Sequence, residues 1–208
     1  MDRKQELSTV EIEELRNRWK GPIGERIRRA LLEGLKKNSY EWVEMLSQIP
    51  KVKVAAPHPE VLDDLRGIAF TGENLDNVSL TFVDLSYSIF EKCSMNSARL
   101  QGSKLSHASF KSTKLIKADL VQVVADHSRF ENCNLSGALL LAANFSDSSL
   151  NHMDMRKSIL IDCSFNDCQL TKMILYGAKV EGAKFPAGFD VDKHLKTQPD
   201  NGSRSPSL

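Results

Sequence analysis

The 208-residue chain has no excess of charge of either sign. It carries 28 Lys plus Arg against 27 Asp plus Glu, a formal net charge of +1. Nucleic-acid-binding proteins are usually basic and proteins that imitate DNA are acidic, so neither class is favoured. No apolar run approaches the roughly 18 residues that cross a bilayer, and the charged N-terminus lacks the apolar core of a signal peptide. We therefore expect a cytoplasmic protein without a membrane span.

The short motifs that mark common active sites are also missing. The chain has no GxSxG elbow, P-loop, dinucleotide fingerprint or HExxH zinc motif. The two closest of its four cysteines are five positions apart, which is not a metal-ligand spacing. In a cytosolic chain they are expected to be reduced fillers of the core. These absences predict no enzyme, no metal and no cofactor. The cysteines are Cys93, Cys133, Cys163 and Cys168.

A five-residue repeat runs without interruption from Phe70 to Phe185. All 24 positions at multiples of five in this range carry a large apolar residue, except Ala125. The residue two places earlier in each unit is mostly small from Ala98 onward, and the intervening residues are mostly polar. A period of five fits neither an α-helix nor a strand. The chain must therefore turn a corner after every unit, with one large and one small side chain pointing inward.

Phenylalanine adds a second, longer period, which spans four units of the repeat. Four units per coil would place the first group of phenylalanines on one inner side of a square coil and the second group on the adjacent side. Leu150 and Leu170 continue the first side, so the core volume per coil stays level, as close packing requires. The first group is Phe70, Phe90, Phe110 and Phe130, and the second is Phe145, Phe165 and Phe185.

Three segments resemble the pentapeptide-repeat family, whose consensus is A(D/N)LXX. They are KADLV (117–121), SGALL (136–140) and YGAKVEGAKF (176–185), and the repeat covers about 116 residues. The resemblance implies a right-handed quadrilateral β-helix with four pentapeptides per coil, so 24 units make about six coils and a rod of about 29 Å. Its narrow lumen would be filled by its own side chains and leave no internal pocket. The expected fold class is mainly β, a solenoid with a small N-terminal helical subdomain.

The residues before the repeat predict helices. Ser8 and Glu11 form a capping box, Pro22 suits the first turn of a second helix, and Ser39 is a candidate cap for a third. A proline-containing linker precedes a short helix expected over 59–66. The predicted organisation is a helical subdomain at 1–66 that caps the solenoid, the β-helix at 67–190, and a polar, disordered tail at 191–208.

One side of the predicted coil breaks the rule that outward positions are polar. Apolar residues occupy these positions on three successive coils, and the neighbouring coils return to Arg99 with Gln101 and to Lys179 with Glu181. On a flat sheet such a cluster marks an interface. We predict a non-enzymatic scaffold that presents this face to a protein partner or to a second copy; alternatively, the N-terminal helices fold back onto it. The predicted partner-binding residues are Val121, Leu139, Leu141, Ile159 and Ile161.

Two other functions compete with this one. His107 and His127 are four units apart, with Asp147 and Asp167 in the same row, and such a ladder could bind a divalent metal. The simpler interpretation is a solvated corner of the coil.

The family resemblance implies a further alternative, because some members imitate duplex DNA and bind DNA gyrase or topoisomerase IV. Residues 66–190 hold 13 basic and 13 acidic residues, a net charge of zero. This neutrality weakens the DNA-mimic hypothesis, and nucleic acid is not an expected partner.

Overall fold

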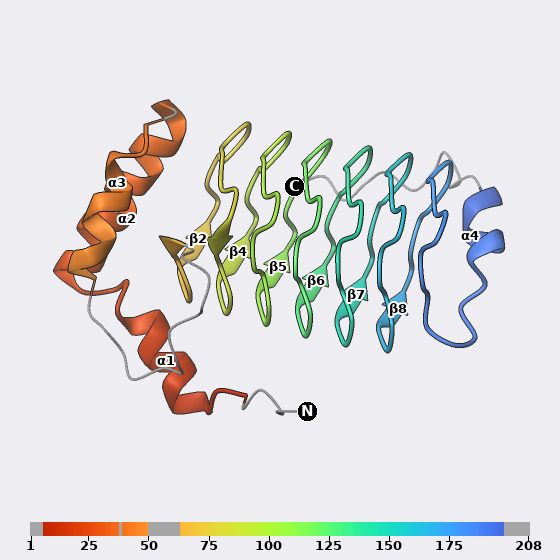
Figure 1. Cartoon of the computed structure of the whole chain (residues 1–208), viewed down its shortest axis with the longest axis horizontal. Coiled ribbons are helices and arrows are strands. Elements are labelled where there is room, and N and C mark those ends of the chain that lie inside the picture. Colours follow the sequence, from red (N-terminus) through yellow and green to blue (C-terminus); the bar gives the residue numbers. More distant parts are fainter. Residues whose placement is uncertain (1–5, 38, 50–62, 198–208) are drawn as a thin grey trace.

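The computed structural model describes residues 6–37, 39–49 and 63–197, and it is a parallel β-solenoid with helices at both ends (Figure 1). No helix in these ranges is long and apolar enough to cross a membrane. In chain order the elements are α1 (Thr9–Asn17), α2 (Pro22–Lys37), α3 (Glu41–Met45), the 3₁₀ helix η1 (Leu46–Gln48), β1 (Asp63–Asp64), β2 (Ala69–Thr71), β3 (Val83–Asp84), β4 (Ile89–Glu91), β5 (Ser109–Lys111), β6 (Arg129–Glu131), β7 (Ser149–Asn151), β8 (Gln169–Thr171) and α4 (Val191–Lys196).

Each coil contains four units of the repeat and has four sides, as the sequence predicts. One side is a six-stranded parallel sheet in the order β2-β4-β5-β6-β7-β8, whose register pairs Phe70 with Phe90 and Phe90 with Phe110. The other three sides are held by bridges at the same interval, such as Asn74 with Ser94. Five full turns separate β2 from β8, which confirms the predicted solenoid of about six stacked coils.

The corners between units contain residues in the left-handed region. From Leu65 to Val180, the second residue after each large core residue has positive φ, and 18 of these residues are not glycine. At Tyr87, with φ of 62°, the Ser88 N–H donates to the Leu85 carbonyl at 3.1 Å, as in a type II turn. The Tyr87 N–H donates to the Ser106 carbonyl of the next coil at 3.0 Å. A non-glycine residue in this region costs on the order of 1 kcal/mol, and the repeated bonds between coils offset this cost.

The large residues fill the lumen as predicted. Those from Phe70 to Phe165 are buried, and only the last ones, such as Leu170 and Phe185, are half-buried. Successive phenylalanine rings stack, with centroids 4.6 Å apart for Phe110 and Phe130. The aromatic column changes sides between Phe130 and Phe145, where the rings meet edge to face at 5.6 Å and 69°.

Most of the polar side chains at the small inward positions form hydrogen bonds, whereas the buried Ser88 hydroxyl has no hydrogen-bond partner among the described residues. Hydroxyls and thiols at several of them donate to the carbonyl of a large core residue on the preceding coil. Thr113 bonds to the Phe90 carbonyl at 3.1 Å, and Cys163 bonds to the Leu140 carbonyl at 2.7 Å. This bonding explains why Ser, Thr and Cys can replace the alanine of the consensus in a buried column.

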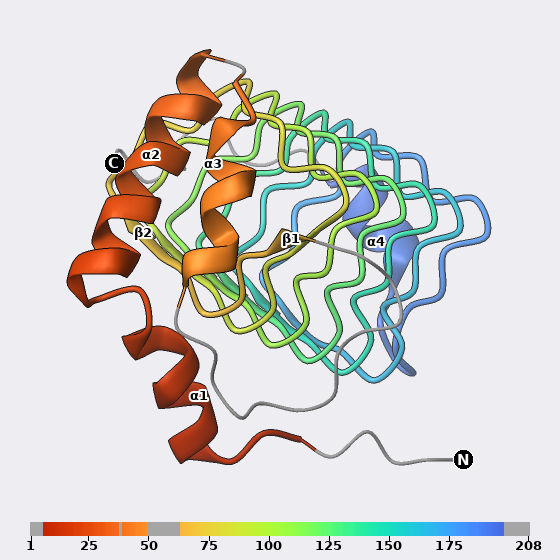
Figure 2. The ribbon, with the colours of Figure 1, turned by 60° about the vertical axis from the view of Figure 1, so that its left-hand side comes forward.

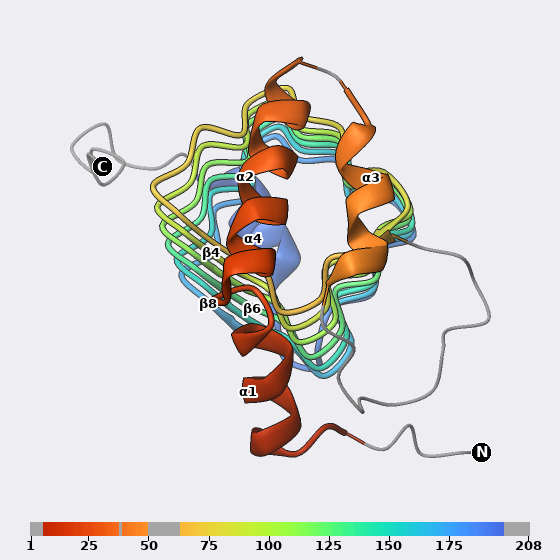
Figure 3. The same ribbon diagram turned by 90° about the vertical axis from the view of Figure 1, so that its left-hand side faces the viewer.

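Helices α2 and α3 cover the open end of the first coil, and α1 extends beyond its outline (Figures 2 and 3). The capping box of α1 is present, with Ser8 and Glu11 bonded reciprocally. Ile27 of α2 and Trp42 of α3 join the same apolar core as Phe70 of the first coil. This packing excludes the alternative in which these helices cover the apolar side face.

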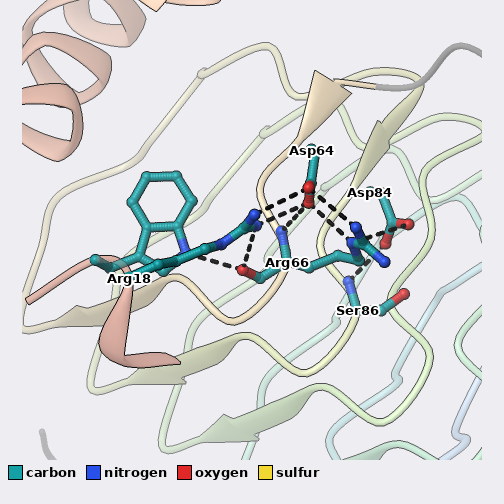
Figure 4. Close-up of polar contacts among 6 residues, drawn as sticks. Arg18, Asp64, Arg66, Asp84 and Ser86 are labelled. Carbon is teal, nitrogen blue, oxygen red and sulfur yellow. Dashed lines mark hydrogen bonds and ion pairs between the residues drawn. The ribbon is translucent and has the colours of Figure 1, made fainter. Parts of the chain in front are cut away.

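An ion network joins the end of α1 to the first coil (Figure 4). The Arg18 guanidinium donates two hydrogen bonds to the Asp64 carboxylate, at 2.8 and 2.9 Å, and the Arg66 guanidinium donates two more. Arg18 and the Trp19 indole both donate to the Arg66 carbonyl. Burial would raise the pKa of Asp64, but the hydrogen bonds and charges of the two arginines outweigh it and hold that pKa well below its usual range.

Two details at the N-terminal side differ from the sequence prediction. Tyr40 is the N-cap residue of α3 and its side chain makes no capping bond, whereas the Ser39 hydroxyl, one residue earlier than the N-cap, accepts from the Glu41 N–H at 3.4 Å. Residues 63–64 form strand β1, which pairs with β3, instead of ending a helix. Residues 50–62, which include the whole predicted linker and the start of the predicted short helix, lie outside the described residues.

A third difference is at the C-terminus, where residues 191–196 form α4 and not a disordered tail. The Asp190 side chain caps this helix by accepting from the Lys193 N–H. Phe189 stacks on Phe185, and the His194 ring stacks on Phe189 at 4.6 Å, which extends the aromatic column past the last coil. The remainder of the predicted tail, from residue 198, lies outside the described residues.

Replacing Asp64 with Asn tests the ion network. The Arg18 side chain is only 3% exposed and would keep an unpaired charge, but the Asp64 side chain is 36% exposed, so solvent screens the pair. We therefore expect the free energy of unfolding to fall by about 1–2 kcal/mol at pH 7, less than for a fully buried pair. Urea unfolding measures this difference, and Asp63→Asn is the control, because burial raises the pKa of Asp63 and no arginine opposes it.

The difference in stability between wild type and Asp64→Asn should depend on pH. The contribution of Asp64 is fully present above its unfolded-state pKa of about 4 and is lost as the pH falls toward its lower folded-state pKa. The gap between wild type and Asp64→Asn should therefore stay constant from pH 7 to pH 5 and narrow toward pH 3. Equal stability of the two proteins at pH 7 would contradict the account.

Candidate protein-interaction face

The five predicted interface residues lie together on one outer side of the solenoid. Leu139 and Ile159 form a β-bridge between successive coils. Asp119 on the preceding coil and Lys179 on the following coil continue the same column of bridged residues. The second column, two residues further along each coil, carries the other three apolar residues. We call this cluster of Val121, Leu139, Leu141, Ile159 and Ile161 the apolar face.

The apolar face is partly open to solvent. Leu141 is 37% exposed and is among the few large hydrophobic residues of the described chain that are exposed, while the other four members are half-buried. The face lies in the middle of the rod, whereas the described helices pack at its two ends (Figure 1). No helix in the described part of the chain therefore packs over it.

Polar residues border the face at its N-terminal end. The Gln101 amide donates to the Asp119 carboxylate at 2.5 Å, and the same carboxylate accepts from the Val121 N–H at 3.2 Å. The Asp119 carboxylate thus accepts two hydrogen bonds at the edge of the apolar face. At the opposite end, Lys179 bridges to Ile159 and returns the column to charge.

Phe82 is an exposed residue near this face that the sequence analysis missed. It is 62% exposed, it occupies a corner position with φ of 55°, and its ring covers Gly102 of the next coil. A Cβ atom at residue 102 would lie 2.5 Å from that ring, so a side chain there would displace the ring. Most other corner positions carry Gly or a polar residue. The phenylalanine at this corner position was therefore the feature of the sequence from which an exposed aromatic ring could have been predicted. Phe82 lies two coils before the level of Val121.

The histidine row forms a stack of rings. Tyr87 stacks on His107 at 4.7 Å and His107 stacks on His127 at 5.0 Å, with interplanar angles of 3° and 9°. Rings stacked face to face do not direct their nitrogens to a common point. Burial lowers the pKa of His107, and the nearby charge of His127 lowers it further by a smaller amount. No cluster of three or more metal-binding side chains occurs in the described ranges.

The four cysteines lie inside the solenoid and are free thiols. Burial raises the pKa of Cys133 and of Cys163 to about 12, and that of Cys168 to about 11. Burial also raises the pKa of Cys93. Since the thiolate is the nucleophile, these side chains are poor candidates for covalent chemistry.

Comparison with known proteins agrees with this architecture. The family model for pentapeptide repeats matches residues 93–130 and 126–160, with eight copies. Residues 93–160 of the solenoid are therefore pentapeptide repeats, as the sequence resemblance implied. No curated protein matches the chain in sequence.

Solved pentapeptide-repeat structures share limited similarity with the chain. QnrB1, a plasmid-mediated fluoroquinolone resistance protein, is 23% identical with a TM-score of 0.40, covering 57% of this chain and 68% of its own. The Arabidopsis thaliana thylakoid-lumen protein AT2G44920 is 25% identical with a TM-score of 0.36, covering 50% and 70%. Rfr23 from the cyanobacterium Cyanothece 51142 is 19% identical with a TM-score of 0.29, covering 59% and 87%. Likeness at this level does not extend to the function of this chain.

Thiol reactivity tests the burial of the four cysteines. We expect no reaction of the native protein with Ellman's reagent and release of four equivalents in denaturant, because burial keeps the sulfurs protonated and inaccessible. Stoichiometric labelling of any cysteine under native conditions would contradict this assignment.

Proposed function

We propose that this pentapeptide-repeat protein is a non-enzymatic scaffold whose apolar face binds an amphipathic helix of a protein partner. The observation that carries the proposal is the set of five apolar side chains on three successive coils, bordered by polar residues. Contiguous exposed apolar surface with a polar rim is typical of a protein-binding site.

The spacing of the coils favours a helix as the occupant. Stacked coils repeat at about 4.8 Å, and successive turns of an α-helix repeat at about 5.4 Å. A helix aligned with the solenoid axis would therefore keep apolar residues at i, i+4 and i+7 close to three successive coils. Leu139 and Ile159 supply one column of contacts, and Leu141 lies at the centre of the other.

The size of the face argues against a stable dimer through this surface. Three coils of one side have a flat area on the order of 150 Å², whereas a standard protein interface buries about 800 Å² per partner. A single helix needs less area than a second solenoid, and its complex would be modest in affinity and reversible.

The chemistry of the solenoid supports a role in binding and not in catalysis. The lumen is filled by stacked side chains, and its thiols are held in the protonated form by burial. No constellation of nucleophile, base and cavity emerges among the described residues that would point to a reaction.

The alternative of a DNA mimic that modulates gyrase or topoisomerase has less support. The solenoid has no net negative charge over residues 66–190. On the six-stranded sheet Glu91 pairs with Lys111 and Lys111 pairs with Glu131, so the sign alternates from coil to coil. A continuous negative surface, which imitation of duplex DNA requires, is not supported by this arrangement.

The double variant Leu141→Lys, Ile159→Lys tests the proposal. Charges on the face should abolish partner capture from a lysate of the source cells, because lysine side chains would have to be desolvated in the complex. Quantitative mass spectrometry of captured proteins is the readout, with Asn151→Lys, Gln169→Lys on the six-stranded sheet as the matched control. Circular dichroism should be unchanged for all variants.

Capture that the double variant leaves unaffected would mean that the interface lies elsewhere. Sedimentation velocity tests whether a second copy of the chain occupies the face instead. If the wild type self-associates and the double variant does not, a second copy and not a partner helix covers the apolar face.

A further inference from the structure

The first strand of the six-stranded sheet has a free edge. β2 pairs with β4 on one side and has no strand partner on the other among the described residues (Figure 1). Its Ala69 and Thr71 are both exposed. Proteins usually cover such an edge, because unpaired backbone groups are a template for another strand.

The second coil shows which groups are unpaired in β2. There the Ile89 N–H donates to the Ile68 carbonyl, and the Glu91 carbonyl accepts from the Gly72 N–H, both at 2.9 Å. Ala69 and Thr71 hold the equivalent register positions on the first coil, which no preceding strand pairs with in the described part of the chain. The Ala69 N–H and the Thr71 carbonyl therefore face the space beside the helices.

A groove runs along this edge. It has a volume of about 880 Å³ and lies between β2 and the helical segments around α1 and α2. At one end, α1 contacts the first coil so closely that a Cβ atom on Gly67 would lie 2.9 Å from the Leu15 carbonyl. The helical wall of the groove, which includes Asn17 and Trp19, is thereby fixed against the coil.

We propose that this groove binds an extended peptide segment of a partner protein, which adds to β2 as a further strand. A donor and an acceptor spaced along an open strand edge match the backbone of an extended polypeptide. The site is separate from the apolar face and rests on a different observation.

The walls of the groove favour a peptide of low net charge. Basic and acidic side chains balance one another along it, and Arg28 already pairs with Glu25 at 3.2 Å and Glu73 at 3.9 Å. Recognition therefore depends on backbone hydrogen bonds, and affinity should change less than twofold between low salt and 0.5 M NaCl. The charged residues of the lining are Arg16, Lys20, Arg28, Glu13, Glu25 and Glu73.

The floor of the groove has a small apolar part. Ala69 and Ile89 form it, and Trp19 of the helical wall is a further apolar residue of the lining. This surface suits one apolar side chain of the bound peptide, whose neighbours in an extended strand would point to the opposite side.

Selection from a phage-displayed random heptapeptide library on the full-length chain tests the proposal. Enriched peptides, made synthetically with a fluorophore, are measured by fluorescence anisotropy. Ala69→Pro removes the outward N–H and should weaken binding at least tenfold, while the matched control Ala69→Ser keeps it and should bind within twofold of wild type. Hydrogen exchange at the Ala69 amide of the wild type should slow when peptide is bound, and this readout needs no variant.

Three results would overturn the site. They are a library that yields no peptide, peptides that bind Ala69→Pro and wild type equally, and an Ala69 amide whose exchange is unchanged by peptide. Peptides that lose binding to Leu141→Lys, Ile159→Lys but not to Ala69→Pro would belong to the apolar face, so failure here is distinguishable from failure of the proposed function.

Discussion

The turn of the backbone after every fifth residue is the constraint on which the rest of the structure depends. A residue with positive φ at the corner lets the chain bend and lets its N–H bond to the next coil, as Tyr87 does with Ser106. The bend brings residues four units apart into register, so Phe70 packs on Phe90 and Phe90 on Phe110. Hydrogen bonds and apolar stacking therefore reinforce one another along the solenoid axis.

The ends of the rod follow from the same constraint. A solenoid that stops leaves core side chains and strand edges exposed, and each end here uses a different device. At the first coil, α2 and α3 add their apolar residues to the core that contains Phe70, and the Arg18–Asp64 ion pair links the end of α1 to the coil. At the last coil, aromatic stacking continues through Phe189 to His194 in α4.

The features that recur along the chain or have a local sequence signature could be predicted, and those that depend on contacts between distant residues could not. The stacked phenylalanines, the four-sided coil and the capping box at Ser8 all follow from spacing, and the structure confirms them. Helix α4 was missed because so short a segment carries too little periodicity to be distinguished from a polar tail. The pairing of Arg18 with Asp64 joins distant parts of the chain, which no local pattern reveals. The apolar face was predicted as a cluster, whereas the exposed ring of Phe82 depends on the particular fold of one corner.

Deletion of one whole coil, measured by urea unfolding, tests the central claim most directly. Removal of residues 131–150 takes out four complete units and keeps every later large residue in its inward column, so the account predicts a shorter protein that still unfolds in one cooperative transition. Removal of Gly137 alone shifts all later units by one position, so their large residues leave the inward columns. The coils after residue 137 should then no longer take part in the cooperative transition. A single-residue deletion that is tolerated better than the whole-coil deletion would contradict the account.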